Sequence, residues 1–337
     1  MEKTLRIVVD AMGGDNFPGA PVEGAVMAVK AAEGFDVILA GKEEILRKEL
    51  DRLGYSGDRI RIRDCREVIE MAEPPVRAIQ TKKDSSIVAG LGMIRKGEAD
   101  AFVSAGSTGA VIAGAQVIVG RIKGIRRSPL ATLIPTEKGV SLLIDCGANV
   151  DARPDQLVQF AQMGSVYMEN VLHISNPSVG IVNIGAEDEK GNALVKETIP
   201  LLRERQDIRF IGSVEARDIP AGGTDVIVTE AFTGNVVLKL YEGTASMFKR
   251  MLSSTLKSSV RGMIGGALVK PLIKKALRSY DASEYGGAPL LGLKGLVVKT
   301  HGNSGPVEIR NSVLQCRTFY EEKVNEKIEK AISGGEG

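Results

Sequence analysis

Short apolar runs that end in glycine, a small polar residue or an acid recur along this chain, and they constrain its fold more than any other feature. The four clearest are Ile7–Asp10 leading into Ala11–Asp15, Phe102–Ser104 into Ala105–Ala110, Leu142–Asp145 into Cys146–Asp151, and Val226–Thr229 into Glu230–Asn235. In an open parallel sheet, ligands bind beyond the carboxyl ends of the strands. The repeated polar strand ends therefore predict one composite site and a small-molecule enzyme.

Further runs rich in Val and Ile predict an α/β fold with a mostly parallel sheet. Segments long enough for helices separate them, as in right-handed βαβ units, and they occupy residues 36–40, 59–64, 100–104, 141–145, 179–184, 208–212, 225–229 and 296–300. A length of 337 residues fits roughly two domains or one large α/β unit. Because no linker or internal repeat marks a border, we treat residues 1–337 as one catalytic unit.

Composition argues against several other classes of protein. Lys and Arg total 44 against 42 acids, and aromatic residues make up only 4% of the chain, so nothing favours a nucleic-acid partner. Cys65, Cys146 and Cys316 lack zinc-ligand spacing and do not suggest a disulfide framework. Neither a signal-peptide core nor an apolar stretch of roughly 18 residues is found. We therefore expect a soluble cytoplasmic protein without a metal or cofactor.

The segment 243–280 contains no acid but eight cations. Its apolar residues fall at near-helical spacing, and several glycines with Pro271 supply a break, which predicts a basic amphipathic helical hairpin inserted in the catalytic unit. Two interpretations stay open: a helix pair packed on the core with a solvated basic face, and a surface for an anionic partner. The residues expected to contact such a partner are Arg261, Leu268, Lys270, Leu272, Lys274, Lys275 and Arg278.

A glycine-rich turn directly after a predicted strand is a candidate phosphate site. Gly106-Ser107-Thr108-Gly109 can place backbone N–H groups and hydroxyls at a helix N-terminus. It is neither a Walker sequence nor a dinucleotide fingerprint, and an ordinary tight turn is the alternative. Upstream, Arg77, Lys82 and Lys83 could close on a phosphate or form a solvated helix face.

Three other strand ends carry candidate site residues. The loop Asp145–Asp151 is either a structural turn or an active-site loop, with Cys146 expected to be a small core residue. Lys190 is the one cation in the loop Glu187–Asn192, suited to neutralising an oxyanion or phosphate, although a surface lysine is the alternative. His301 ends a predicted strand and is either a site residue or a turn residue. We expect His173, by contrast, to be structural.

Taken together, these motifs resemble the bacterial phosphate acyltransferases of phospholipid synthesis, the PlsX family. The resemblance runs in order from about residue 5 to residue 320. One departure is that Glu230-Ala231 replaces the family's usual Asp-Gly before Phe-Thr-Gly-Asn, which puts the role of the acid at 230 in doubt. The segments that carry the resemblance are Asp10–Asp15, Ser104–Ala110, Val119–Ile122, Asp145–Asp151, Gly164–Tyr167, Glu187–Asn192, Phe232–Val236 and Tyr285–Ala288.

The resemblance implies transfer of a long acyl chain from the thioester of acyl carrier protein to inorganic phosphate, giving acyl phosphate. It also implies a three-layer α/β/α sandwich related to isocitrate dehydrogenase-like folds and phosphotransacetylase, assembled as a homodimer, with no cofactor. If the hairpin meets an anionic membrane, the enzyme associates peripherally with the inner face of the cell membrane.

On this basis each candidate residue receives a hypothetical role. The phosphate-binding residues are Ser104, Gly106, Ser107, Thr108 and Gly109. Lys190 and Asn235 stabilise the thioester oxyanion, and His301 assists proton transfer. Asp145, Asn149 and Asp151 orient these groups. No cysteine or serine with a recognisable base is found, which fits direct attack by phosphate.

Three rival functions are weighed against this one. A phosphotransacetylase-like enzyme would use coenzyme A thioesters for the same chemistry. A non-enzymatic membrane scaffold would need only the hairpin and leaves the polar strand ends unexplained. A nicotinamide dehydrogenase lacks its fingerprint and its ribose acid.

Overall fold

The structure, a computed structural model, describes residues 4–278 and 285–334, and for residues 274–278 it describes the backbone only. The chain divides into two compact units. Unit 1 comprises Met1–Thr132, Gln162–Asn176 and Ser283–Gly337, and unit 2 comprises Leu133–Ala161 and Pro177–Ala282. Each unit has its own sheet and is described separately.

The sheet of unit 1 is parallel except at one edge. Its strands are β1 (Leu5–Asp10), β2 (Phe35–Gly41), β3 (Ile60–Asp64), β4 (Ala101–Ser104), β10 (Ala288–Leu290) and β11 (Leu296–Lys299). Their order is β10-β11-β4-β1-β2-β3, and only β10 runs antiparallel to its neighbour. The carboxyl ends of β1, β4 and β11 therefore lie side by side at one edge.

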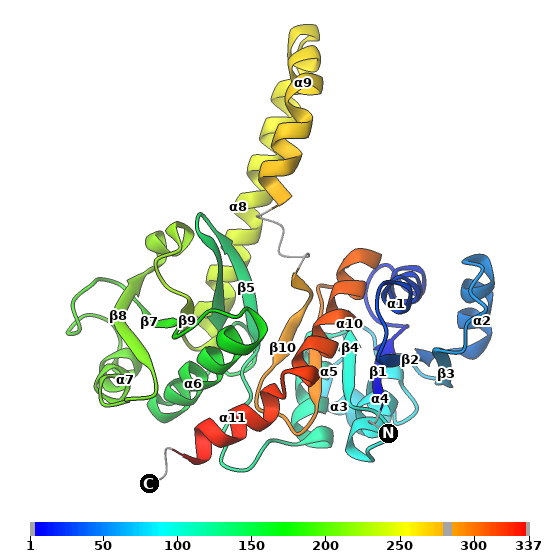
Figure 1. Cartoon of the computed structure of the whole chain (residues 1–337), viewed down its shortest axis with the longest axis horizontal. Coiled ribbons are helices and arrows are strands. Elements are labelled where there is room, and N and C mark those ends of the chain that lie inside the picture. Colours follow the sequence, from blue (N-terminus) through cyan, green and yellow to red (C-terminus); the bar gives the residue numbers. More distant parts are fainter. Residues whose placement is uncertain (1–3, 279–284, 335–337) are drawn as a thin grey trace. The chain divides into compact units, whose positions relative to one another are not determined.

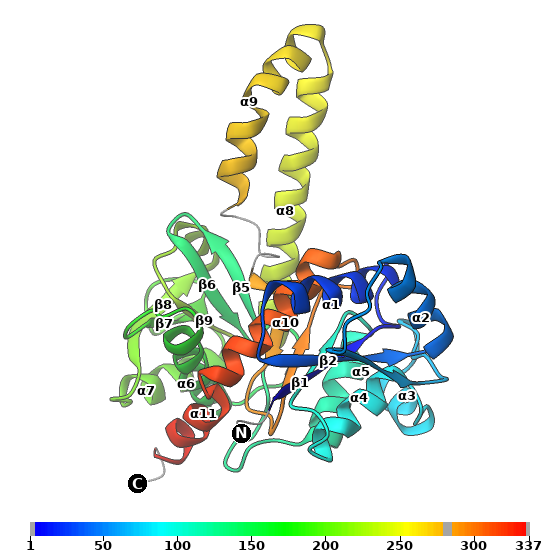
Figure 2. The same ribbon diagram turned by 45° about the vertical axis from the view of Figure 1, so that its right-hand side comes forward.

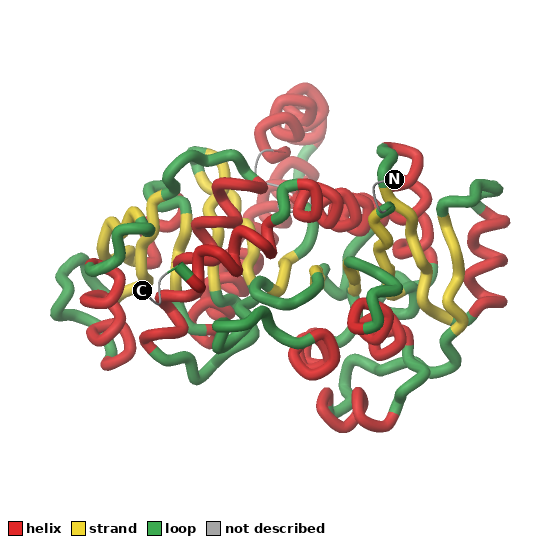
Figure 3. The backbone as a smooth tube through the Cα atoms, turned by 60° about the horizontal axis from the view of Figure 1, so that its bottom comes forward, coloured by secondary structure: helices red, strands yellow, loops and turns green. Residues whose placement is uncertain are grey.

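Helices flank the strands of unit 1 (Figure 3). Two of them, α1 and α10, contact β1. They also pack closely against each other, because Gly24 of α1 leaves room for Ile309 of α10. A separate group is formed by α4 and α5, of which α4 contacts β1, β2 and β4. The helices are α1 (Gly19–Ala31), α2 (Glu43–Arg52), α3 (Pro75–Thr81), α4 (Ser86–Arg95), α5 (Thr108–Gly114), the π-helical turn η1 (Ala115–Val119), α10 (Pro306–Glu321) and α11 (Val324–Ser333).

Unit 2 repeats the scheme with a second sheet. Its strands are β5 (Ala131–Thr136), β6 (Gly139–Ile144), β7 (Ser178–Asn183), β8 (Arg209–Glu215) and β9 (Val226–Val228), in the order β5-β6-β9-β7-β8. Because β6, β9, β7 and β8 pair in parallel, their carboxyl ends share one edge. The helices are α6 (Pro154–Val171), whose last ten residues belong to unit 1, α7 (Ala193–Arg203), the 3-10 turn η2 (Ala216–Ala221), α8 (Ala231–Lys257) and α9 (Val260–Arg278).

The hairpin predicted for residues 243–280 is formed by α9 and the later part of α8, a helix that begins earlier, at Ala231. Helix α8 begins against β6, and the two helices lie side by side in both views (Figures 1 and 2). A side chain at Gly262 would lie 2.6 Å from the Leu256 carbonyl oxygen, so this glycine allows α9 to turn back on α8. Most apolar side chains of the hairpin are exposed, including Leu268 at 74% and Leu272 at 69%. The interpretation as a core-packed helix pair is therefore wrong.

The mostly parallel α/β fold predicted from the apolar runs is confirmed. Each of the eight Val- and Ile-rich runs overlaps a strand, and so does Ile7–Asp10. The strands form two sheets where the pattern had suggested one. Two strands were missed, β5 and β10, and each contains a proline, Pro135 and Pro289, which weakens the strand signal.

Candidate active site

Three loops of unit 1 meet at the carboxyl ends of β1, β4 and β11. The backbone N–H of Asp15, after β1, donates to the carbonyl oxygen of Gly302, after β11, at 2.7 Å. Gly14 has φ +88°, and a side chain there would place its Cβ 2.8 Å from both Ala105, after β4, and the Gly302 oxygen. Glycine at position 14 is therefore required by conformation and by space, and it allows the three loops to pack together.

The predicted phosphate turn occupies the middle of these three loops. Ser104 and Gly106 are buried, and the Gly106 N–H donates to the Ser104 hydroxyl at 3.0 Å, so this amide already has a partner within the protein. Ser107 precedes α5 and is 4% exposed. Thr108, at the first position of α5, is exposed, and Gly109 follows it half-buried. Thr108 is thus the residue of the turn whose side chain is most open to a ligand.

The basic stretch before α4 holds itself together. Lys82 is ion-paired with Glu73 at 2.5 Å, and Lys83 donates to the carbonyl oxygen of Ile79 in α3. Arg77 is exposed on α3, a helix that packs against α5. Lys82 therefore has a structural partner, whereas Arg77 presents its guanidinium to solvent.

His301 lies in the loop after β11, in the same unit as the phosphate turn. Its side chain is exposed, and Nδ1 faces the backbone N–H of Asn303 at 3.5 Å. The His301 N–H donates to the Glu308 carboxylate at 3.3 Å, and Ser304 bonds back to the His301 carbonyl oxygen. The loop is thus ordered by its own hydrogen bonds while the imidazole stays accessible.

In unit 2, the loop after β6 is organised by one buried carboxylate. Asp145 is fully buried, and Oδ1 accepts from the N–H groups of Gly147 and Ala148 at 3.0 Å each. Oδ2 accepts from the backbone N–H and the side-chain amide of Asn149 at 2.8 and 2.7 Å. Asp151, two residues further on, is exposed. The geometry gives Asp145 an orienting position and fixes the Asn149 amide.

The acid at position 230, where the sequence departs from its family pattern, caps α8. The Glu230 carboxylate accepts from the N–H groups of Phe232 and Thr233 at 2.6 and 3.0 Å, and also from the Thr233 hydroxyl. A carboxylate at this place satisfies orphan donors and complements the helix dipole. In this chain, therefore, the hydrogen-bond partners of the Glu230 carboxylate are structural groups at the start of α8.

The first turns of α8 lie directly on the Asp145 loop. A side chain on Gly234 would overlap the Asp145 carbonyl oxygen, and the Ala231 N–H donates to the Asn149 carbonyl oxygen at 3.0 Å. Asn235, the next residue, is exposed. Glycine at 234 thus permits the close approach that sets Asn235 beside this loop.

Lys190 lies in the loop after β7, with half of its side chain exposed. Its Nζ is 2.8 Å from the Glu187 carboxylate, and its stem crosses Gly185, where an added Cβ would lie 2.5 Å from Cδ. The hydrogen bond from Lys190 lowers the pKa of Glu187. An exposed i,i+3 pair of this kind contributes little to stability, so Lys190 can exchange its partner for a substrate anion.

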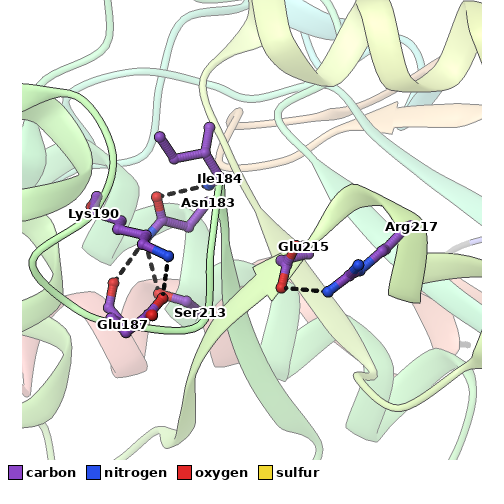
Figure 4. A network of polar contacts seen from close by, with 7 residues as sticks. All are labelled: Asn183, Ile184, Glu187, Lys190, Ser213, Glu215 and Arg217. Carbon is purple, nitrogen blue, oxygen red and sulfur yellow. Dashed lines mark hydrogen bonds and ion pairs between the residues drawn. The ribbon is translucent and has the colours of Figure 1, made fainter.

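Asn183, the last residue of β7, holds the Lys190 loop, and the sequence analysis gave it no role (Figure 4). Its side-chain amide is buried; Nδ2 donates to the Lys190 carbonyl oxygen at 3.2 Å and to the Ser213 hydroxyl at 3.0 Å. Its Oδ1 accepts from the Ile184 N–H at 2.8 Å. The sequence did contain a signal for this role, because an asparagine ends an apolar strand just before a glycine-rich loop.

The three cysteines are buried, which confirms the expectation for Cys146 as a core residue. Burial raises the pKa of Cys65 to about 12 and also raises the pKa values of the Cys146 and Cys316 thiols. Such thiols stay protonated at neutral pH and are poor nucleophiles. In the described part of the chain, no group of three His, Cys, Asp or Glu residues could hold a metal ion.

The predicted site residues therefore fall into two clusters. The phosphate turn and His301 belong to unit 1, whereas Asp145, Asn149, Lys190 and Asn235 belong to unit 2. Both clusters follow the carboxyl ends of parallel strands, where α/β enzymes bind their ligands. The fold and the two clusters are typical of α/β enzymes that bind small molecules at the ends of their strands.

Comparison with known proteins names the family. The family described as "Fatty acid synthesis protein" matches residues 5–327. The "Phosphate acyltransferase" of Clostridium botulinum (strain Loch Maree / Type A3) is 49% identical over 325 residues, which is 96% of this chain and 97% of that protein. The chain belongs to this family, the PlsX-type phosphate acyltransferases, and it is an acyltransferase enzyme.

Solved structures agree with this fold. A phosphotransacetylase from Streptococcus pyogenes is similar with a TM-score of 0.62 and 18% identity, covering 95% of each chain. Isocitrate dehydrogenase from Methylococcus capsulatus is similar with a TM-score of 0.51 and 10% identity, covering 97% of this chain and 88% of its own. The expected isocitrate dehydrogenase-like fold is confirmed.

Proposed function

We propose that this acyltransferase moves a long acyl group from the thioester of acyl carrier protein to inorganic phosphate, forming acyl phosphate for phospholipid synthesis. The observation that carries the proposal is near full-length identity of 49% to a protein named for phosphate acylation. An exposed lysine on an ordered loop and a glycine-rich turn with an exposed threonine suit the two charges that this reaction must manage.

The chemistry needs little beyond positioning and charge. A phosphate oxygen attacks the thioester carbonyl carbon, and the carbonyl becomes a tetrahedral oxyanion. When it collapses, the C–O bond to phosphate remains, the C–S bond breaks with its electron pair on sulfur, and the thiolate takes a proton. Phosphate is itself the nucleophile, so no covalent enzyme intermediate is required.

Residue roles follow from these charges. Thr108 and the turn around it bind phosphate, and Lys190 with Asn235 stabilises the oxyanion. The buried Asp145 fixes Asn149, and exposed His301 exchanges a proton with phosphate or the leaving group.

The donor is the point on which a phosphotransacetylase-like enzyme would differ. We expect kcat/KM for an acyl-acyl carrier protein to exceed that for the coenzyme A thioester of the same acyl chain at least about tenfold, equivalent to about 1.4 kcal/mol. The measurement is acyl phosphate formation from both donors at saturating phosphate. Equal values, or a preference for coenzyme A, would assign the alternative function.

The hairpin of α8 and α9 is proposed to contact an anionic membrane. Within residues 243–273, the cations Lys249, Arg250, Lys257, Arg261 and Lys270 are all exposed beside exposed Met, Leu and Ile side chains. Lys274, Lys275 and Arg278 belong to α9 by their backbone, but their side chains lie outside the described part. No helix of the described chain is long and apolar enough to cross a bilayer. Contact with the membrane surface suits an enzyme whose acyl phosphate product is lipophilic. We also propose that the enzyme is a homodimer.

Changing Leu268 and Leu272 to Glu should release the protein from vesicles containing anionic lipid, because an apolar face inserted at the interface is lost. Arg261→Glu with Lys270→Glu should do the same with a stronger salt dependence, since each cation contributes about 1 kcal/mol near the surface. Vesicle co-sedimentation measures both. The control is Arg47→Glu with Lys48→Glu on α2, which carries the same charge change.

The carrier protein is also acidic, so the same variants need a kinetic measurement without vesicles. An unchanged KM for acyl-acyl carrier protein with lost vesicle binding supports the membrane. A large rise in that KM with vesicle binding retained assigns the hairpin to the carrier protein, and a change of mass in solution assigns it to the dimer.

A further inference from the structure

Three buried polar residues from neighbouring strands form a row beneath the phosphate turn. Asp10 ends β1, Ser104 ends β4 and Lys299 ends β11, and they are 1%, 1% and 6% exposed. Lys299 is in register with Ser104, and Asp10 follows Val9, whose partner is the residue before Ser104. Side chains in register on parallel strands point to one face. A carboxylate, a hydroxyl and an ammonium group thus share one buried layer.

Hydrogen bonds connect this row to the turn. Asp10 Oδ2 accepts from the Ser104 hydroxyl at 2.7 Å, and Oδ1 accepts from the Met12 N–H at 3.1 Å. The Ser104 oxygen in turn accepts from the Gly106 N–H at 3.0 Å. A serine hydroxyl has one proton. Because that proton points at Asp10, the lone pairs of Ser104 are left for the Gly106 amide.

The backbone passes directly over the carboxylate. A side chain on Gly13 would collide with Asp10 Oδ2, and one on Gly106 would place its Cβ 3.0 Å from the same oxygen. Burial raises the pKa of Asp10, while its hydrogen bonds from Ser104, Ser86 and Met12 and the charge of Lys299 act in the opposite direction. A bare negative charge here would repel a phosphate bound above it, and the ammonium group of Lys299 offsets that charge.

We propose that Asp10 is a positioning residue for phosphate: acting through the Ser104 hydroxyl, it sets the orientation of the Gly106 peptide, and hence the placement of Ser107 and Thr108. Lys299 keeps the layer beneath the turn close to neutral. Asp10 itself touches no substrate. This inference rests on the proposed function, in which the turn binds phosphate.

The decisive variant is Asp10→Asn, which keeps the shape and removes one acceptor. Met12 and Ser104 donate to different oxygens of Asp10, so the single oxygen of an asparagine in the same position can keep only one of these two hydrogen bonds. We expect the KM for phosphate to rise about threefold to tenfold, as for the loss of one hydrogen bond, with the KM for the acyl donor unchanged within twofold. Lys299→Met should raise the phosphate KM as well, because the offsetting charge is lost. Ser104→Ala tests the relay if Asp10→Asn does not fold.

A matched control lies in unit 2, where Asp225 accepts from the backbone N–H and the hydroxyl of Ser178 at 2.7 Å each, at the amino end of β7. Asp225→Asn removes the same kind of acceptor from an Asp–Ser pair remote from the strand ends that carry the site. It should lower the melting temperature without changing the phosphate KM. A purely structural role for Asp10 predicts that the two variants behave alike, and that result overturns the inference.

Thr108→Val separates the inference from the function on which it rests. If the turn binds phosphate, this variant raises the phosphate KM more than the donor KM. A rise with Thr108→Val and none with folded Asp10→Asn or Ser104→Ala overturns the role of Asp10 alone. No rise with Thr108→Val removes phosphate from the turn, and the inference falls with it.

Discussion

Lys190→Ala is expected to lower kcat about a hundredfold or more while the fold stays intact. The side chain is half-exposed and forms an ion pair with Glu187 on the same loop, so its removal costs little stability. Loss of one preorganised stabiliser of a developing oxyanion typically costs 10²- to 10³-fold in turnover, roughly 2.7–4 kcal/mol. Single-turnover acyl transfer and a melting curve measure the two effects separately.

Two comparison variants sharpen this test. Lys190→Arg should also be impaired, because a forked guanidinium does not reproduce a point charge. Lys196→Ala, an exposed lysine six residues away on α7, should leave kcat unchanged. Activity of Lys190→Ala within threefold of the parent enzyme would remove this residue from the site.

Much of the fold could be predicted from sequence because parallel strands buried on both faces leave continuous apolar runs. Val8 and Val9 in β1 and Leu142 and Leu143 in β6 are fully buried. Apolar runs of this kind predicted nearly every strand. The division into two sheets was not readable, because no composition change separates Thr132 from Leu133. Strand partners depend on contacts that are remote in sequence.

The candidate site was predicted as a set of strand ends but not as a set of hydrogen bonds. Gly106 was expected to offer its amide to phosphate, yet Ser104 accepts that N–H. Asp10 was predicted only as one of several polar strand ends, and Asn183 received no role. The contacts of both depend on partners as distant as Ser104 and Ser213. Residue type and spacing indicate where a loop lies. Which donor pairs with which acceptor, however, depends on the folded structure.

The hairpin was likewise predictable only in part: its helices follow from the sequence pattern, but the exposure of its apolar face does not. Helical spacing and the absence of acids predicted two basic amphipathic helices, and α8 and α9 are present. An apolar face is equally compatible with burial in a core and with exposure to a partner. The exposure of Leu268 and Leu272 in the folded chain distinguishes the two.

Asp145→Ala should be the most destabilising single change in the candidate site. The buried carboxylate accepts four hydrogen bonds, and its removal leaves the N–H groups of Gly147, Ala148 and Asn149 without that acceptor. The Asn149 N–H is buried, whereas those of Gly147 and Ala148 are half-buried. A buried unsatisfied donor costs about 1–3 kcal/mol, so we expect a loss of roughly 3 kcal/mol for the three groups together. For a unit of this size the melting temperature should fall by about 6 °C or more.

The matched control for Asp145→Ala is Asp151→Ala, which removes an exposed carboxylate from the same loop. A surface change of this kind should alter stability by less than about 0.5 kcal/mol. Asp145→Asn should fall between the two, because the amide keeps one oxygen for the loop and turns a donor toward the other N–H groups. Because Gly234 packs on the Asp145 carbonyl oxygen, the loop and the start of α8 should loosen together. Hydrogen exchange would then speed up at Asn149 and Asn235 alike in Asp145→Ala, and unchanged exchange at Asn235 would show that Asp145 holds its own loop alone.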